Sequence, residues 1–154
     1  MTTDADARWL VGAAETEAMG ARLAGRIAPG DVVALYGDLG AGKTTLARGL
    51  LRALGFDGDV PSPSFPIVIA YDPPDVRIPL WHVDLYRIED KAELEELGLD
   101  DALADSALLI EWPERLASRL WPDALRLRLE RDGDDRRRLT WDVPAAWESR
   151  WPPK

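Results

Sequence analysis

The 154-residue sequence contains no cysteine, which excludes disulfide bonds, thiolate catalysis and metal sites with cysteine ligands. Its single histidine, His82, excludes a metal site built from several histidines. Asparagine and glutamine are also absent. Without asparagine the chain cannot carry the N-K-x-D motif that reads guanine, and without glutamine it lacks the side chain that orients water in Ras-type GTPases. The composition therefore disfavours a regulatory GTPase.

Long hydrophobic runs are missing as well, because no stretch approaches the roughly 20 apolar residues that a membrane span needs. Basic residues are outnumbered, with 19 Lys and Arg against 28 Asp and Glu, giving a net charge of −9. Such a surface repels DNA and anionic membranes. The first residues are acidic where a secretory signal would be basic. We therefore expect a cytoplasmic protein with no membrane or DNA partner.

With 46% hydrophobic and 31% charged residues, the chain has the composition of a globular protein. No repeat or low-complexity tract divides it, so we expect a single domain over residues 1–154. A buried strand is predicted at 32–36, followed by a glycine-rich loop and a helix over 43–54 that ends at Gly55.

The remaining pattern predicts a mixture of strands and helices. Helices are expected at 16–27 and 91–97, strands at 65–71, 80–86 and 107–110, and a hairpin from 125–130 and 138–143. Together these elements predict an α/β fold with a mixed sheet and a C-terminal β-hairpin.

The strongest chemical signal is the segment from Gly37 to Thr44, GDLGAGKT, which fully matches G-x-x-x-x-G-K-[ST]. Glycines let successive backbone N–H groups turn toward a phosphate at the start of a helix. Lys43 would bridge the β- and γ-phosphates, and the Thr44 hydroxyl would bind Mg²⁺. A simple turn with a solvated lysine is disfavoured, because a strand and a helix are expected on either side independently of the motif.

Two carboxylates are candidates for the same site. Asp84 lies near the end of one expected strand, and Glu111 directly follows another. Acids at the carboxyl ends of core strands are where open α/β sheets bind ligands, and Mg²⁺ prefers such oxygen ligands. The alternative for each is a solvated carboxylate or a salt-bridge partner. Which of the two would orient an attacking water stays open.

Four further segments accompany the loop in order, and they are SPSF at 62–65, HVDLYR at 82–87, EELG at 95–98 and IEWP at 110–113. This series resembles the TsaE (YjeE) family, the P-loop ATPase of bacterial tRNA threonylcarbamoyladenosine biosynthesis. The resemblance runs from about residue 16 to about residue 123. It implies a three-layer P-loop NTPase-like fold that hydrolyses ATP with Mg²⁺, weakly alone. It also implies TsaB and TsaD as partner proteins, with tRNA reached through their complex.

The resemblance also implies site residues. The nucleotide would be bound by Asp38, Leu39, Gly40, Ala41, Gly42, Lys43, Thr44 and Thr45. Catalysis would depend on Lys43, Asp84 and Glu111, and Mg²⁺ would be held by Thr44, Asp84 and Glu111. The segment 62–65 resembles the family's switch, which could face the γ-phosphate, and Ser64 stands there in place of the usual threonine.

Other conspicuous residues allow more than one interpretation. His82 shares a strand face with Asp84, so it could orient that carboxylate, contact a partner, or be a partly buried histidine with a satisfied hydrogen bond. Trp112 could lie beside the nucleotide, on the surface that meets a partner, or in the core. The arginines of 126–138 could form a solvated sheet face, or Arg136 or Arg137 could contact the nucleotide and the whole face tRNA.

Two other functions compete with an accessory ATPase. A P-loop kinase would use the same loop to phosphorylate a small molecule, although the segment between 54 and 80 is short for a lid and an acceptor pocket. A binding module would use nucleotide occupancy only to order a docking surface. Phosphorylated products would identify the kinase, and tRNA modification that survives loss of Glu111 would identify the module.

Overall fold

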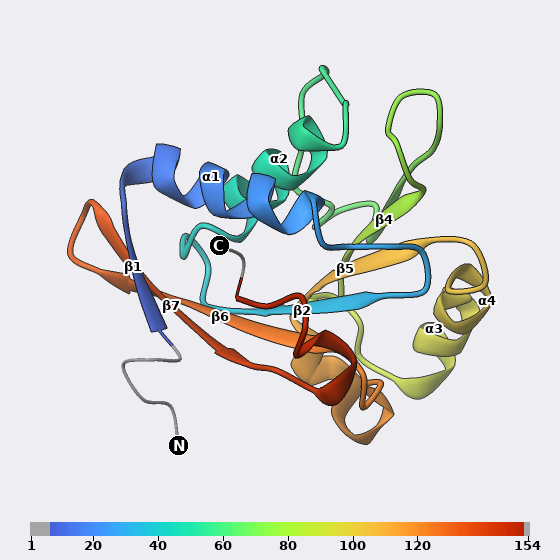
Figure 1. The fold of residues 1–154 in the computed structure, drawn as a ribbon. Coiled ribbons are helices and arrows are strands. Elements are labelled where there is room, and N and C mark those ends of the chain that lie inside the picture. Colours follow the sequence, from blue (N-terminus) through green and yellow to red (C-terminus); the bar gives the residue numbers. More distant parts are fainter. Residues whose placement is uncertain (1–6, 153–154) are drawn as a thin grey trace.

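The structure, a computed structural model, describes residues 7–152 and contains one mixed sheet with helices on both faces (Figure 1). The strands are β1 (Ala7–Val11), β2 (Val32–Tyr36), β3 (Val68–Tyr71), β4 (Leu80–Asp84), β5 (Ala107–Glu111), β6 (Leu125–Asp132) and β7 (Arg136–Asp142). The α-helices are α1 (Gly12–Ala24), α2 (Lys43–Ala53), α3 (Lys91–Glu96) and α4 (Leu99–Ala102). Two 3-10 helices, η2 (Pro113–Arg119) and η3 (Ala145–Trp147), complete the described elements.

The sheet has the strand order β1-β7-β6-β2-β5-β4-β3. Its centre is parallel, since β2 pairs in parallel with both β5 and β6, and β5 pairs in parallel with β4. Its margins are antiparallel, where β7 pairs with β1 and β6, and β3 with β4. The predicted α/β class, mixed sheet and hairpin are confirmed, and one strand of that hairpin lies directly beside β2.

The two faces of the sheet bury separate hydrophobic clusters, and β2 contributes alternately to both. Val33 and Leu35 pack with α1 and α2 on one face, whereas Val32 and Ala34 pack with residues of α4 and η2 on the other. Alternation along a strand explains this division, because successive side chains point to opposite faces. Residues of the glycine-rich loop and of α2 therefore belong to the first face.

Helices α1 and α2 lie side by side over the sheet, and two glycines bring them into close contact (Figure 1). A Cβ atom at Gly49 would lie 2.0 Å from the Glu17 carbonyl oxygen, and one at Gly20 would lie 2.1 Å from that of Leu46. No side chain fits at these distances. The crossing of α1 fixes the position of α2, whose first residue is Lys43.

The N-terminal elements differ from the sequence prediction. Strand β1 was not predicted, and α1 covers Gly12–Ala24 rather than 16–27. The helix begins earlier because the chain turns directly out of β1 at Gly12, whose N–H donates to the Asp135 carbonyl. It ends earlier because Gly25 caps it, although Ile27 is still buried.

Strands β3 and β4 are shorter than the predicted 65–71 and 80–86. Residues before Val68 form turns, with Ile67 at φ 72° and its N–H bonded to the Pro63 carbonyl. Strand β4 ends at Asp84 because the side chain of that residue accepts a hydrogen bond from the Tyr86 N–H and turns the chain. Asp84 is therefore the last residue of β4, and the segment that precedes β3 is a turn.

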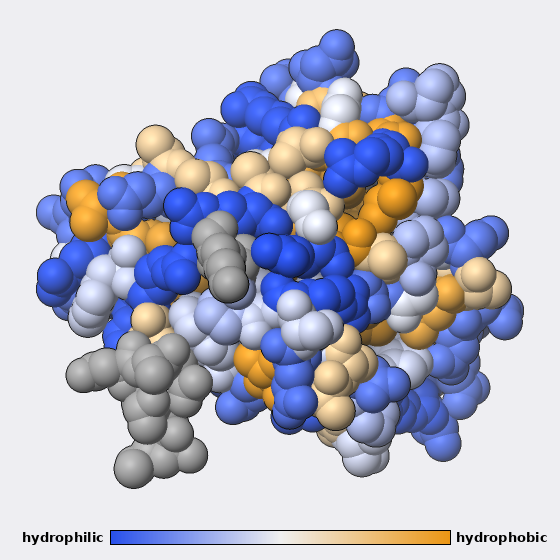
Figure 2. Space-filling view, viewed as in Figure 1, coloured by the Kyte–Doolittle hydropathy of each residue, from blue (hydrophilic) through white to orange (hydrophobic). Residues whose placement is uncertain are grey.

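Within residues 7–152, no helix is both long and apolar enough to cross a bilayer. Hydrophilic residues cover most of the face seen in Figure 2, where hydrophobic residues show only in small groups.

Candidate functional site

The glycine-rich loop connects the end of β2 to the start of α2, as the motif requires. Gly40 and Gly42 adopt φ values of 81° and 105°, which side-chain-bearing residues rarely adopt. At Gly37 a Cβ atom would lie 2.6 Å from the Leu129 carbonyl oxygen of β6. The loop is therefore held against β6, in a conformation that its glycines permit.

Lys43 is buried at the start of α2, with 5% of its surface exposed. Its Nζ lies 3.9 Å from Glu111 Oε1 and 4.2 Å from the ring centroid of Trp112. Among the described residues this Nζ has no hydrogen-bond partner. Burial lowers the pKa of Lys43, while the nearby Glu111 carboxylate opposes that shift. An ammonium with three unused donors in a buried position suits an anionic ligand with several oxygen acceptors.

Glu111 ends β5 and is 3% exposed. Its Oε2 lies 2.6 Å from Nε2 of the fully buried His82. The structure thus supports the interpretation of His82 as a buried histidine with a hydrogen bond. The alternative that it orients Asp84 is wrong, because its partner is the carboxylate of the neighbouring strand.

Asp84 is the cross-strand neighbour of Glu111 but belongs to a different hydrogen-bond network. Its Oδ1 accepts from the Tyr86 N–H at 2.9 Å, and its Oδ2 accepts from the Ser64 hydroxyl at 3.0 Å. The Ser64 hydroxyl is also 2.7 Å from the Ser62 hydroxyl. The segment 62–65 is therefore tied to the strand-end carboxylate, and serine provides the hydroxyl that the bond requires.

A cleft of about 240 Å³ collects most of the predicted site residues. It is lined by Leu39, Gly40, Gly42, Lys43, Thr44, Thr45, Ser62, Ser64, Asp84, Glu111, Trp112 and Arg137. Asp38 and Ala41, also predicted, line an adjoining cavity of about 400 Å³ with Glu114, Arg128 and other residues. The structure therefore brings together the loop, both carboxylates and the serine segment, which are far apart in the sequence.

The donors in this cleft fit Mg²⁺. Within residues 7–152 no group of three or more His, Asp or Glu side chains forms a metal cluster. The cleft offers two carboxylates, Asp84 and Glu111, together with the Thr44 hydroxyl. Mg²⁺ is usually bound by one or two carboxylates and completes its shell with water and substrate phosphate oxygens. This small oxygen set is suited to that ion and not to a closed protein cage.

Arg137 is a cleft residue that the sequence offered only as an alternative. Its Nε donates to the Ala41 carbonyl at 2.9 Å and its terminal nitrogen to the Gly40 carbonyl at 3.3 Å. Arg136 instead pairs with Asp132 and stacks on Trp9. The sequence shows several arginines close together in residues 126–138. Only the pairing of β7 with β6 shows which of them reaches the loop.

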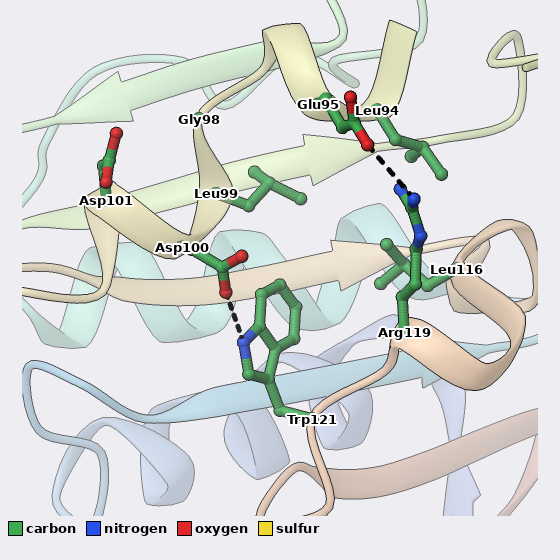
Figure 3. A pocket seen from close by; sticks show the side chains of 9 residues that line it. All are labelled: Leu94, Glu95, Gly98, Leu99, Asp100, Asp101, Leu116, Arg119 and Trp121. Carbon is green, nitrogen blue, oxygen red and sulfur yellow. Dashed lines mark hydrogen bonds and ion pairs between the residues drawn. The ribbon is translucent and has the colours of Figure 1, made fainter. Parts of the chain in front are cut away.

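A larger cavity, of about 510 Å³, lies between α3, α4 and η2 (Figure 3). Four of its polar side chains are paired with one another, Arg119 with Glu95 at 3.2 Å and Trp121 Nε1 with Asp100 at 2.8 Å. None of the loop residues or strand-end carboxylates lines it. The cavity is therefore separate from the cleft around Lys43.

Comparison with known proteins identifies the family. A family profile described as threonylcarbamoyl adenosine biosynthesis protein TsaE matches residues 10–139. The chain belongs to the TsaE family. The matched TsaE region contains the loop, Asp84, Glu111 and Arg137.

Individual TsaE relatives are similar over most of their length. The tRNA threonylcarbamoyladenosine biosynthesis protein TsaE of Bacillus subtilis is 41% identical over 128 residues, which cover 82% of this chain and 78% of that protein. The protein of the same name from Streptomyces coelicolor is 46% identical over 114 residues, covering 73% and 77%. The crystal structure of Bacillus subtilis YdiB superposes with a TM-score of 0.74 at 34% identity, covering 88% of this chain and 82% of the other.

Proposed function

We propose that this TsaE-family chain binds and hydrolyses ATP in the presence of Mg²⁺. It would act as an accessory component of the complex that forms threonylcarbamoyladenosine in tRNA, with TsaB and TsaD as partner proteins. The observation that carries the proposal is the buried Lys43 ammonium. Its Nζ has no hydrogen-bond partner among the described residues, and Lys43 lines the same cleft as residues of the glycine-rich loop. Membership of a family named for threonylcarbamoyl adenosine biosynthesis supports the pathway.

Each group of the cleft has a role in this proposal. Backbone amides within residues 38–45, other than that of Ala41, which donates to the Asp38 carbonyl, would bind the phosphates together with the Lys43 ammonium. Thr44, Asp84 and Glu111 would hold the metal ion. Bound Mg²⁺ supplies positive charge that neutralises the phosphate oxygens as the transferred group loosens. Either Asp84 or Glu111 would also orient the attacking water.

The free protein is suited to slow turnover. Lys43 is held 3.9 Å from Glu111, so the ammonium is shared between a carboxylate and an incoming phosphate. Glu111 is in turn bonded to His82. A partner that acts on the cleft through Ser64 and Asp84, the cross-strand neighbour of Glu111, would free the lysine for the phosphates. This is the basis on which we expect stimulation by TsaB and TsaD.

The test is phosphate release from ATP by the purified chain, alone and with TsaB and TsaD. We expect slow release alone, faster release with both partners, and none above background from Lys43→Ala. Thr44→Ala should bind ATP but lose its dependence on Mg²⁺. Equal release from the wild-type chain and Lys43→Ala, with partners present, would overturn the proposal.

A nucleotide-gated binding module is the second candidate, and one observation favours it. Ser64 connects Asp84 to a segment whose next residue, Phe65, is 85% exposed. A ligand at the cleft could therefore reorder a surface segment without being hydrolysed. If Glu111→Ala binds ATP and supports undiminished tRNA modification, turnover is dispensable and the module describes the function.

A further inference from the structure

Arg137 reaches the glycine loop from a strand that lies on the other side of β6. Strand β7 is antiparallel to β6, and β6 is parallel to β2, whose end begins the loop. The Arg137 side chain lies on the same face of the sheet as α1 and α2, and its guanidinium crosses to the loop. There it donates to the carbonyls of Ala41 and Gly40 at 2.9 and 3.3 Å.

These two bonds orient the backbone of the loop. In a trans peptide, the carbonyl of one residue and the N–H of the next point in opposite directions. Fixing the Ala41 carbonyl therefore fixes the direction of the Gly42 N–H. Fixing the Gly40 carbonyl does the same for the Ala41 N–H, which donates to the Asp38 carbonyl at 3.0 Å. The turn from Asp38 to Gly42 is thus held from inside by its own hydrogen bond and from outside by the guanidinium.

Without such a restraint this segment is free to rearrange. Gly40 and Gly42 flank Ala41, and glycine adopts both positive and negative φ values at little cost. Rotation of the Ala41–Gly42 peptide would turn a carbonyl toward the place where an N–H is needed, and a carbonyl repels phosphate oxygens. A planar guanidinium with several donors can hold two neighbouring carbonyls at once, whereas a single ammonium cannot do so with the same geometry.

We propose that Arg137 is a positioning residue of the nucleotide site, which holds the loop's peptide planes so that its amides converge on the phosphates. This inference rests on the proposed function, because it assumes a phosphate ligand. The adjacent residue provides a matched control. Arg136 points to the opposite face of β7, pairs with Asp132 and stacks on Trp9, so its removal subtracts the same charge without touching the loop.

The test measures dissociation constants for ATP and for ADP by isothermal titration calorimetry. It compares the wild-type chain with Arg137→Ala, Arg137→Lys, Arg136→Ala and Lys43→Ala at constant ionic strength. We expect Arg137→Ala to weaken both nucleotides by about tenfold, the loss of roughly one charge-assisted hydrogen bond. Arg137→Lys keeps the positive charge but lacks the planar guanidinium that donates to two carbonyls, so it should recover little of the lost affinity. Arg136→Ala should stay within about twofold of wild type.

Each result decides between distinct explanations. Equal effects on ATP and ADP support positioning of the loop, whereas a loss confined to ATP indicates a contact with the γ-phosphate and overturns it. Wild-type affinity for nucleotide in Arg137→Lys or in Arg137→Ala would also overturn the positioning role of Arg137. Urea unfolding of each variant separates loss of binding from loss of folding, and Arg137→Lys serves if Arg137→Ala is unfolded. If wild type and Lys43→Ala fail equally to bind nucleotide, the proposed function itself has failed.

Discussion

Replacing Glu111 with glutamine should destabilise the free protein and strengthen its binding of metal-free ATP. The substitution keeps the side-chain shape but removes the charge 3.9 Å from Lys43 Nζ. At an effective dielectric constant of about 20, two unit charges at this distance attract by about 4 kcal/mol before solvation costs. The loss has an upper limit, because Lys43 can instead release its proton, which costs at most about 4 kcal/mol at pH 7.5. We expect the free energy of unfolding to fall by about 2 kcal/mol.

ATP should reverse much of this loss. Triphosphate oxygens can accept hydrogen bonds from Lys43 Nζ in place of the carboxylate, and the variant no longer presents Glu111 as a competing anion. We therefore expect Glu111→Gln to bind ATP about tenfold more tightly than wild type when Mg²⁺ is removed with EDTA, and to hydrolyse it poorly when Mg²⁺ is present. Urea unfolding with and without ATP, followed by circular dichroism, measures the stability, and calorimetry measures the affinity.

Glu148 provides the control, because it is an exposed acid that lines neither the cleft nor the adjoining cavity and is not among the charges that affect Lys43. Glu148→Gln removes the same formal charge and should change stability and ATP affinity little. The reasoning is refuted if Glu111→Gln is as stable as wild type and binds metal-free ATP more weakly. That pair of results would mean that the carboxylate does not hold the lysine in the free protein.

Three further predictions concern other parts of the structure. Gly49→Ala should destabilise the protein by about 1–3 kcal/mol in urea unfolding, because its Cβ would lie 2.0 Å from the Glu17 carbonyl oxygen and the clash exceeds the gain in helix propensity. Tyr71→Phe should stabilise it by up to about 1 kcal/mol, since the buried hydroxyl has no hydrogen-bond partner among the described residues. Ser64→Ala should lower ATP turnover about fivefold by removing the hydroxyl bonded to Asp84, and Ser64→Thr should retain it.

The first and third of these have direct controls. Gly25 caps α1 at a negative φ, and a Cβ there would meet nothing closer than 3.6 Å, so Gly25→Ala should be nearly neutral. A destabilisation equal to that of Gly49→Ala would contradict the close-crossing argument. Unchanged turnover in Ser64→Ala would show that its bond to Asp84 has no part in hydrolysis.

The effect of Tyr71 can be checked by its pH dependence. Burial raises the pKa of Tyr71 above 10.0, its value in the unfolded chain. The folded state therefore keeps the proton that the unfolded state loses, so this contribution to stability is present below pH 10.0 and is lost as the pH rises toward the folded pKa. The stability advantage of Tyr71→Phe should widen above pH 10.0, and an advantage that narrows there would contradict the assignment.

The loop and its flanking elements were predictable because their signals are local. Strand β2 is a short apolar run, α2 has a regular apolar stripe, and the motif joins them within a few residues. The two carboxylates were predictable for a similar reason, since each follows or ends such a run. The bonds that these carboxylates make were not predictable. His82 bonds to Glu111 and not to Asp84, because a partner on the neighbouring strand depends on register.

Features that depend on pairing between segments distant in the chain could not be predicted from the sequence. Strand β1 is five residues long and its only sheet partner among the described strands is β7, so nothing in its own pattern identified it. The contact of Arg137 with the loop spans 96 residues of sequence and depends on β6 lying between β7 and β2. Residues 136 to 138 are all arginines, so the sequence does not distinguish between them. Successive side chains of a strand point to opposite faces, and of Arg136 and Arg137 only Arg137 contacts the loop.

The two strand-end carboxylates, though neighbours across β4 and β5, divide the cleft into two parts with different access to the surface. Glu111 contacts groups with almost no exposed surface, His82 through a hydrogen bond and Lys43 at 3.9 Å, so its environment changes only if the core of the cleft changes. Asp84 is bonded to Ser64, which lies on an exposed segment. A protein that docks on the surface can therefore act on Asp84 through that segment without unfolding the core, whereas Glu111 responds directly to what binds Lys43. Under the proposed function, Glu111 lies next to the lysine that would bind the nucleotide, and Asp84 is linked to the segment that a partner would reach.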